Sequence, residues 1–202
     1  MPSKVIALGL NYRLHIKELH PDFEGEPVIF IKPDTSVIGH NDAIIRPRNS
    51  KRVDYEAELA FVIKSECRNI SEEDAGKYIL GYTCLNDVTA RDLQKIDGQW
   101  TRAKGFDTFC PIGPYIATGI DPDNLEIMAI LNGEVKQHAN TSDMLYTVPQ
   151  ILAYISRIMT LRQGDVICTG TPGGIGPMNA GDVIEIRIEN IGSLINTVKD
   201  EE

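Results

Sequence analysis

Three acidic residues alternate along the segment VDYEAELAFVI, residues 53–63. Side chains two residues apart point to the same side of a β-strand, so Asp54, Glu56 and Glu58 would form one row. Carboxylates in such a row could bind a hard divalent cation such as Mg²⁺, which takes oxygen ligands. The alternative is the solvated face of a half-buried antiparallel strand, where acidic side chains are common. The segment alone leaves both possibilities open.

A third carboxylate ligand could come from a second strand. Asp87 stands at the end of the strand-like run LGYTCLNDV, residues 80–88. A strand end holds its side chain rigidly, so Asp87 is the best candidate to join Glu56 and Glu58. Asp54 is then expected to be an outer or structural partner.

Two other groups have spacings that suit catalysis. His15 and Glu18 form H-x-x-E, and on a helix these positions share a face, so the acid could orient the ring of a general base. Lys104, in WTRAKGFD, could offer a cation to an oxyanion or a carboxylate substrate. The alternative for all three is an ordinary charged surface.

Substrate contacts are suggested at two further places. Arg91 and Gln94 are spaced i and i+3 just past Asp87, and a guanidinium is well shaped for bidentate binding of a carboxylate. Thr171 lies in TGTPGGIGP, residues 169–177, whose glycines allow close approach of a ligand. A helix-surface pair and a plain strand connection are the respective alternatives.

The elements that must position these residues are mostly short strands. Strand-like runs occupy residues 5–9, 28–33, 53–63, 80–88, 127–137, 165–170 and 182–192. Asn132-Gly133 predicts a hairpin. Helices are expected from Ser71, after Thr147 and over residues 89–96. The pattern predicts one β-rich domain with a few short helices.

Length, charge and hydropathy limit the function classes. The chain has 202 residues and a net charge of −9, with no basic stripe, which argues against a nucleic-acid partner. Its four cysteines show no zinc or disulfide-framework pattern. No apolar run is long enough for a signal peptide or a membrane span, so we expect a cytoplasmic protein that does not act at a membrane.

Several motifs together resemble the fumarylacetoacetate hydrolase family. In chain order they are DYEAELA (54–60), NDVTARDLQ (86–94), WTRAKGFDTFCPIGP (100–114), LNGEVKQ (131–137) and GDVICTGTPGGIGP (164–177). The likeness runs from about residue 8 to about residue 190 and is greatest to the short, acylpyruvase-like members. It implies an α+β, mostly β fold in which mixed sheets roll into a barrel-like or sandwich core around a metal pocket. It also implies a single catalytic domain over residues 1–202, a Mg²⁺ or Mn²⁺ ion, and a homodimer.

The resemblance also implies roles for individual residues. The metal ligands would be Glu56, Glu58 and Asp87. His15 and Glu18 would form a catalytic base on a mobile lid, residues 10–27, and Lys104 would be the active-site lysine. The positions implied to contact substrate are Arg91, Gln94, Thr171 and Lys32.

The implied reaction is carbon–carbon bond hydrolysis of 2,4-dioxo acids (acylpyruvates) through a metal-bound enolate, with a small 2-oxo acid as the substrate class. Because the same enolate serves other reactions, two enzymatic alternatives stay open. One is a lyase, oxaloacetate decarboxylase, and the other is an isomerase or decarboxylase of 2-hydroxy-hepta-2,4-diene-1,7-dioate type acids. A non-catalytic metal-binding scaffold is the third alternative.

Overall fold

A computed structural model describes residues 2–13 and 25–202. Its largest unit is a seven-stranded sheet with the strand order β2-β1-β12-β6-β7-β9-β3. The bounds are β1 Val5–Gly9, β2 Val28–Lys32, β3 Val37–Ile38, β6 Ala57–Ile63, β7 Ile79–Asn86, β9 Cys110–Ala117 and β12 Val166–Cys168. The sheet is mixed, since β1 runs parallel to β12 while β12, β6 and β7 are antiparallel to their neighbours.

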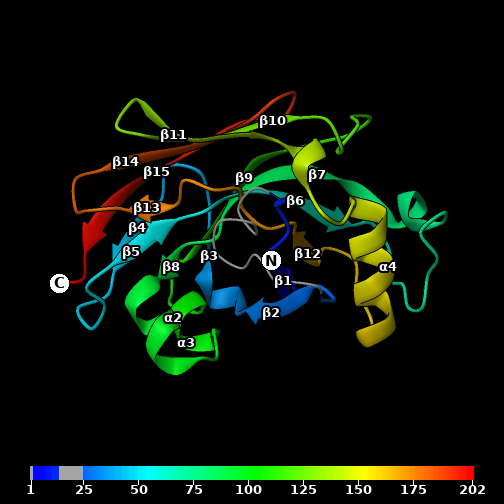
Figure 1. The fold of residues 1–202 in the computed structure, drawn as a ribbon, viewed down its shortest axis with the longest axis horizontal. Helices are drawn as coiled ribbons and strands as arrows, with labels where there is room; N and C mark the ends of the chain where they lie inside the picture. Colours follow the sequence, from blue (N-terminus) through cyan, green and yellow to red (C-terminus); the bar gives the residue numbers. More distant parts are fainter. Residues whose placement is uncertain (1, 14–24) are drawn as a thin grey trace.

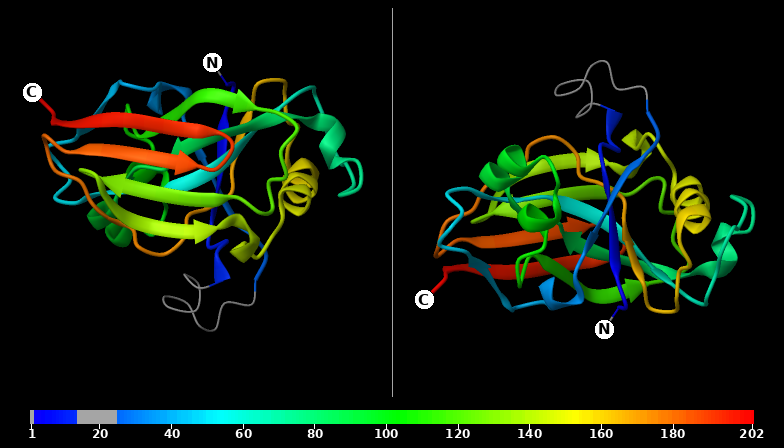
Figure 2. Two further views of the ribbon diagram at one scale, coloured as in Figure 1. Left: turned by 90° about the horizontal axis from the view of Figure 1, so that it is seen from above. Right: turned by 90° about the horizontal axis from the view of Figure 1, so that it is seen from below.

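A five-stranded sheet covers one face of this core, with the order β11-β10-β14-β15-β4. Its strands are β4 Ala43–Arg46, β10 Glu126–Leu131, β11 Glu134–Asn140, β14 Val183–Ile188 and β15 Gly192–Asp200. A small sheet, β13-β5-β8, comprises β5 Val53–Tyr55, β8 Thr89–Ala90 and β13 Gly176–Pro177. Figure 1 shows the five-stranded sheet along the top of the molecule, and Figure 2 shows its strands side by side. The expected mostly β fold of rolled, mixed sheets is confirmed.

The predicted hairpin is present between β10 and β11. Asn132 and Gly133 both have positive φ, 53° and 82°, as a type I′ turn requires. The turn brings β11 alongside β10, and the buried Gln137 of β11 accepts the Ala57 N–H of β6.

The acid-bearing segment 53–63 differs from the predicted single strand. It is interrupted at Glu56, so that β5 belongs to the small sheet and β6 to the seven-stranded sheet. Alternation along β6 is retained, with Leu59 and Phe61 in the main core and Ala60 and Val62 in a second apolar cluster. Both faces are therefore covered, and the expectation of a half-buried strand was wrong.

Helices flank the sheets. In the described part of the chain they are α2 Arg91–Asp97, α3 Thr101–Lys104 and α4 Val148–Ile158, with 3₁₀ turns at Asp34–Ser36, Ala75–Tyr78 and Thr141–Asp143. In Figure 1, α2 and α3 lie below the sheets at one end and α4 lies at the other. α4 begins at Thr147 with a capping box, as expected. The helix predicted from Ser71 is only the short 3₁₀ turn.

No described helix combines the length and apolar character needed to cross a bilayer.

Candidate metal centre

Three carboxylates, on β6, on the residue before it and on the residue after β7, converge beside a pocket. One oxygen from each of Glu56, Glu58 and Asp87 lies within 4.8 Å of the other two. These residues are 5%, 1% and 1% exposed, respectively. Buried charges persist in proteins when they are paired or bind a metal. The alternative of a solvated acidic face is therefore wrong for this segment.

The end of β7 fixes the backbone on which these carboxylates stand. The Glu56 N–H donates to Asn86 Oδ1 at 2.9 Å, and the Asp87 N–H donates to the Glu56 carbonyl at 2.9 Å. On β6, Ala57 pairs with Asn86 and Glu58 with Leu85. The interruption at Glu56 is therefore satisfied by β7 and places Glu56 next to Asp87.

Lysine side chains surround two of the three carboxylates. Lys104 Nζ lies 2.8 Å from Glu56 Oε2 and 2.5 Å from Asp87 Oδ2. Lys32 Nζ lies 2.5 Å from Asp87 Oδ1 and also donates to the Val88 carbonyl at 3.3 Å. Both lysines are nearly or fully buried, at 3% and 0% exposed.

Arginine side chains complete the charged network. Arg91 donates to Glu56 and, through Nε, to Asp54 Oδ2 at 2.9 Å. Arg52 pairs with the same Asp54 through Nε and Nη2, at 2.8 and 3.1 Å. Asp54 is 0% exposed and orients Arg91, in keeping with its expected outer role.

The carboxylates differ in their electrostatic surroundings. Burial and the charges of Asp87 and Glu56 hold the pKa of Glu58 well above its usual range, although Lys104 and the Gly170 N–H oppose them. For Glu56, burial acts upward, but Lys104 and Arg91 outweigh it and lower the pKa to about 2. For Lys104, burial acts downward, but Asp87 and Glu56 outweigh it and raise the pKa, so the ammonium stays charged.

These surroundings fit a divalent cation. Glu58 accepts the Gly170 N–H at 2.8 Å, yet among the described residues no lysine or arginine lies within ion-pair distance of it. A buried carboxylate beside two others needs positive charge, which a hard cation with oxygen ligands would supply. Glu56, Glu58 and Asp87 are the residues that would hold it.

A pocket of about 430 Å³ opens above this centre. Glu56, Glu58 and Lys104 line it, together with Arg91, Gln94 and Thr171. Lys32 does not line the pocket, because it is fully buried against Asp87. The structure thus brings Arg91, Gln94 and Thr171 together in one pocket, as expected for substrate contacts. Lys32 instead positions Asp87.

The short helix α2 supplies two of these lining residues. Arg91 Nη1 donates to Gln94 Oε1 at 2.6 Å, as their i, i+3 spacing on one helix face allows. The alternative of an ordinary surface pair does not hold for Arg91, whose side chain is only 13% exposed.

Sequence reasoning gave no role to Gln137, on β11. It is 1% exposed; its Oε1 accepts the Ala57 N–H at 2.9 Å, and its Nε2 donates to Thr171 Oγ1 at 2.9 Å. The residue therefore joins strand β6, which carries Glu58, to the loop that carries Thr171. Its motif, LNGEVKQ, was visible in the sequence, but nothing in the spacing marked this side chain as buried.

Asn11 was also missed. Its buried amide donates to the Thr169 carbonyl at 2.7 Å and accepts the Tyr146 N–H at 2.8 Å. Gly170 has φ of 90°, and a Cβ there would lie 3.0 Å from Asn11 Cβ. Asn11 thus fastens the N-terminal chain to the loop whose Gly170 N–H binds Glu58.

His15 and Glu18, predicted as the catalytic base and its partner, lie outside the described residues. The proposed lid over residues 10–27 is described only at its two ends.

The fold is a set of rolled, mixed β-sheets. Three buried carboxylates and a charged lysine lie beside its pocket, so the protein belongs to the class with a candidate divalent-metal site. The chain belongs to the fumarylacetoacetate hydrolase family, since residues 4–199 match the profile described as fumarylacetoacetate (FAA) hydrolase C-terminal. Members of this family include hydrolases, isomerases and a tautomerase.

Two relatives illustrate the likeness in sequence. An uncharacterized protein of Methanocaldococcus jannaschii is 58% identical over 201 residues, covering 100% of this chain and 85% of that protein. The mitochondrial oxaloacetate tautomerase of Xenopus laevis is 43% identical over 209 residues, covering 98% of this chain and 66% of that protein.

Two solved structures extend the likeness from the sequence to the fold. The 2-hydroxyhepta-2,4-diene-1,7-dioate isomerase from Mycobacterium marinum is 50% identical with a TM-score of 0.93, covering 99% of this chain and 75% of that one. The maleylpyruvate hydrolase from Sphingobium sp. SYK-6, in complex with manganese (II) ion and pyruvate, is 35% identical with a TM-score of 0.87, covering 100% of this chain and 72% of that one.

Proposed function

We propose that the protein is a divalent-metal-dependent hydrolase that cleaves a carbon–carbon bond in 2,4-dioxo acids. The observation that carries the proposal is the buried group of Glu56, Glu58 and Asp87, with charged Lys104 bonded to two of them, beside a pocket that Glu56, Glu58 and Lys104 line. The likeness to a hydrolase solved with manganese (II) ion and pyruvate supports both the metal and the product class.

The charge of the site favours an anionic substrate. Four acids, Asp54, Glu56, Glu58 and Asp87, are matched in the network by four bases, Lys32, Arg52, Arg91 and Lys104. A bound Mg²⁺ or Mn²⁺ ion would therefore leave an excess of two positive charges. It would supply Lewis-acid polarisation of the substrate's oxo group.

In this proposal Lys104 stabilises negative charge on the reacting substrate. Its ammonium has three donors, of which Glu56 and Asp87 take two in the described part of the chain. The third can donate to an oxyanion, and because the side chain is 3% exposed, water competes weakly for it. Arg91, Gln94 and Thr171 line the same pocket and would orient the substrate.

In the reaction that we propose, His15, with Glu18 as its predicted partner, takes a proton from water. The water oxygen bonds to the distal keto carbon, and the bond between that carbon and the pyruvate side breaks. The electron pair stays with the pyruvate methyl carbon, which takes up a proton. The products are a carboxylic acid and pyruvate, so the atoms of one water are consumed.

The names of related enzymes make two other substrates second candidates. A tautomerase of oxaloacetate and an isomerase of a dienedioate are both close in sequence or structure. Oxaloacetate decarboxylation and isomerisation or decarboxylation of 2-hydroxy-hepta-2,4-diene-1,7-dioate type acids would need the same stabilised oxygen but no attacking water.

A panel of substrates separates these reactions. The protein is assayed with Mg²⁺ and with Mn²⁺ on an acylpyruvate, on oxaloacetate and on 2-hydroxyhepta-2,4-diene-1,7-dioate. We expect release of pyruvate and the matching acid from the acylpyruvate. Turnover of only oxaloacetate or only the dienedioate would contradict hydrolysis and favour the corresponding alternative, and Mn²⁺ binding without any turnover would favour a scaffold.

A variant tests the role of the metal. Glu58→Ala should lose at least about a hundredfold in acylpyruvate turnover, because loss of a ligand should exceed the tenfold to hundredfold effects of outer partners. Glu66→Ala, at an exposed acid beyond β6, is the matched control. Full activity of Glu58→Ala, or of metal-stripped wild type, would overturn the proposal.

A further inference from the structure

The buried amide of Gln137 forms hydrogen bonds at both of its ends. Its Oε1 accepts the Ala57 N–H at 2.9 Å, while its Nε2 donates to Thr171 Oγ1 at 2.9 Å and to the Pro172 carbonyl at 2.8 Å. The residue is 1% exposed, so water competes weakly for these bonds. Gln137 therefore joins strand β6 to the loop after β12 with every amide hydrogen in use.

The backbone fixes the direction of these bonds. A backbone N–H can only donate and a carbonyl can only accept, so Ala57 requires the oxygen of the Gln137 amide and Pro172 requires its nitrogen. Turning the amide over would place two donors together at Ala57 and two acceptors together at Pro172, which is costly in a buried place. Gln137 therefore presents a donor to Thr171, and not an acceptor.

The hydroxyl of Thr171 must accept that bond through a lone pair of its oxygen. A hydroxyl has one hydrogen to donate, and this hydrogen has no acceptor within residues 2–13 and 25–202. Thr171 is 9% exposed and lines the same pocket as Glu58 and Lys104. The hydroxyl hydrogen is therefore available to a ligand in this pocket.

A hydroxyl with a fixed direction selects the kind of atom that binds to it. A threonine hydroxyl can usually serve either a donor or an acceptor on a ligand, whereas Thr171 already has a donor, Gln137, on its oxygen. It is best matched by an oxygen that carries no hydrogen, as in a carboxylate or an oxo group. A bond from Thr171 to an ionised oxygen would be charge-assisted and short.

We propose that Gln137 is a positioning residue that fixes Thr171 as a hydrogen-bond donor to a carboxylate or oxo oxygen of the bound 2-oxo acid. The choice of a 2-oxo acid rests on the proposed function, whereas the direction of the hydrogen bonds does not. Binding of a simple anion therefore tests the role of Gln137 without turnover.

The first test removes the donor itself. Calorimetry measures binding of oxalate, whose ionised oxygens can only accept, to the Mn²⁺-loaded protein. Thr171→Val keeps the shape of the side chain without its hydroxyl and should weaken oxalate binding about tenfold to a hundredfold, as expected for a lost hydrogen bond to a charged group. Thr171→Ser keeps the donor and should bind oxalate nearly as tightly as wild type. Neither change should alter Mn²⁺ affinity, because Thr171 is not a proposed ligand.

The second test reverses the partner of Thr171. In Gln137→Glu the ionised side chain can still accept the Ala57 N–H but offers no donor, so the Thr171 hydroxyl should donate to it and turn away from the ligand. Oxalate affinity should fall in this variant, and the same change should cost much less in a Thr171→Val background, because both changes remove one donor. If Gln137→Glu does not fold, Gln137→Met, which also offers no donor, takes its place in the same cycle.

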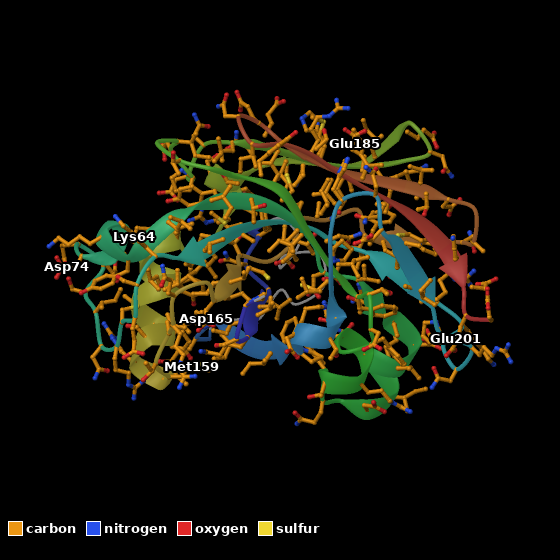
Figure 3. The ribbon with its side chains drawn as sticks, turned by 180° about the vertical axis from the view of Figure 1, so that it is seen from behind. Lys64, Asp74, Met159, Asp165, Glu185 and Glu201 are labelled. Atoms are coloured by element: carbon orange, nitrogen blue, oxygen red, sulfur yellow. The ribbon has the colours of Figure 1, made fainter. Side chains whose placement is uncertain are left out.

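Matched controls lie away from the pocket. Gln150→Glu changes an exposed glutamine on α4, and Thr197→Val changes an exposed threonine on β15. Figure 3 shows α4, with Met159 labelled at its end, across the molecule from α2, which supplies part of the pocket lining. Both controls should keep the wild-type affinity for oxalate.

The outcomes separate this role from the proposed reaction. If no acylpyruvate is hydrolysed but the oxalate affinities follow the expected order, the reaction fails and the role of Gln137 stands. If the loaded wild type does not bind oxalate, or Thr171→Val binds it as tightly as wild type, Thr171 is not the donor and the inference is overturned. Equal losses from the Gln137 change in both backgrounds would show that Gln137 acts only on the shape of the site, which would also overturn it.

Discussion

Lys104 and Lys32 distribute positive charge unevenly over the three carboxylates. Between them they contact Asp87 at both oxygens and Glu56 at one, whereas Glu58 receives a backbone N–H from Gly170. Two carboxylates are therefore neutralised by the protein itself. Glu58 is the ligand whose charge depends most on a bound cation.

We predict that Glu58→Gln separates stability from metal binding. The amide can still accept the Gly170 N–H but removes one of three adjacent buried charges. The free energy of unfolding of the metal-free protein should stay the same or rise by on the order of 1 kcal/mol, because repulsion is relieved. Mn²⁺ affinity should fall at least about a hundredfold. Urea unfolding without metal and calorimetric titration measure the two effects.

Glu66→Gln, at an exposed acid, is the matched control and should leave both quantities unchanged. A strongly destabilised Glu58→Gln protein would show that the carboxylate is structural in the absence of metal and would contradict this account of its charge.

Asp165 is a buried acid away from the metal centre that sets a pH dependence of stability. Burial of its carboxyl acts to raise the pKa, but the Arg162 N–H and the side chains of Lys4 and Ser3 outweigh it, so the pKa is lowered. A lowered pKa in the folded state means that this stabilisation is present above the unfolded value, about 3.9, and is lost as pH falls through the folded value.

Asp165→Asn should therefore lower the free energy of unfolding at pH 7 by roughly 1.5–3 kcal/mol, as for hydrogen bonds to a charged group. The gap from wild type should narrow as pH falls below about 4. Denaturant unfolding across pH measures this difference in the free energy of unfolding. Asp107→Asn, which changes an exposed acid, is the control. A gap that is the same at pH 7 and pH 3 would rule out the charge as its source.

At the scale of elements, the interruption between β5 and β6 makes the metal centre possible. An uninterrupted strand would keep Glu56 in the same hydrogen-bonded ladder as Glu58. Instead, the Glu56 N–H bonds to the Asn86 side chain and the Glu56 carbonyl accepts from Asp87, which draws the two chain segments together. Alternation in the sequence predicted the row of acids but could not predict a break whose partners lie about thirty residues away.

The predictable parts of the site are those set by local pattern. Strand periodicity placed Glu56 and Glu58 together, and the end of β7 placed Asp87 beside them. The partners of Gln137 and Asn11 could not be predicted, because each of these side chains bonds to backbone atoms from distant elements. Lys32 was expected at the substrate, yet its side chain is fully buried and donates to Asp87.

Gln137 lies on the β10–β11 hairpin, yet we predict that its side chain stabilises the site. In Gln137→Ala the buried Ala57 N–H loses its acceptor and Thr171 loses its donor, so we expect a loss of about 1–3 kcal/mol in stability and a raised KM. Lys136→Ala, at the exposed neighbouring position, should change stability by less than about 0.5 kcal/mol. Thermal unfolding and steady-state kinetics compare the pair, and equal behaviour of the two variants would contradict a linking role for Gln137.

Over the whole molecule, the pocket joins segments that are distant in sequence. Its lining extends from Leu8 to Ile175 and draws on β1, β2, the acid-bearing segment, α2, α3 and the loop after β12. An ion held by Glu56, Glu58 and Asp87 would contact all three only when the segments at β6 and β7 are assembled, so its binding is coupled to folding.

We therefore predict that a divalent ion stabilises the whole protein. At a free Mn²⁺ concentration of about 100 times Kd, the free energy of unfolding should rise by about 2.7 kcal/mol, provided that the unfolded chain does not bind the ion. For a chain of this length, that corresponds to a Tm increase of roughly 5–10 °C. Calorimetric melting with Mn²⁺, with Mg²⁺ and with chelator measures it. Glu58→Gln should show no such increase in Tm. Only a site that includes Glu58 can lose its stabilisation when that carboxylate alone is neutralised. An equal increase in the variant would therefore show that the ion binds elsewhere.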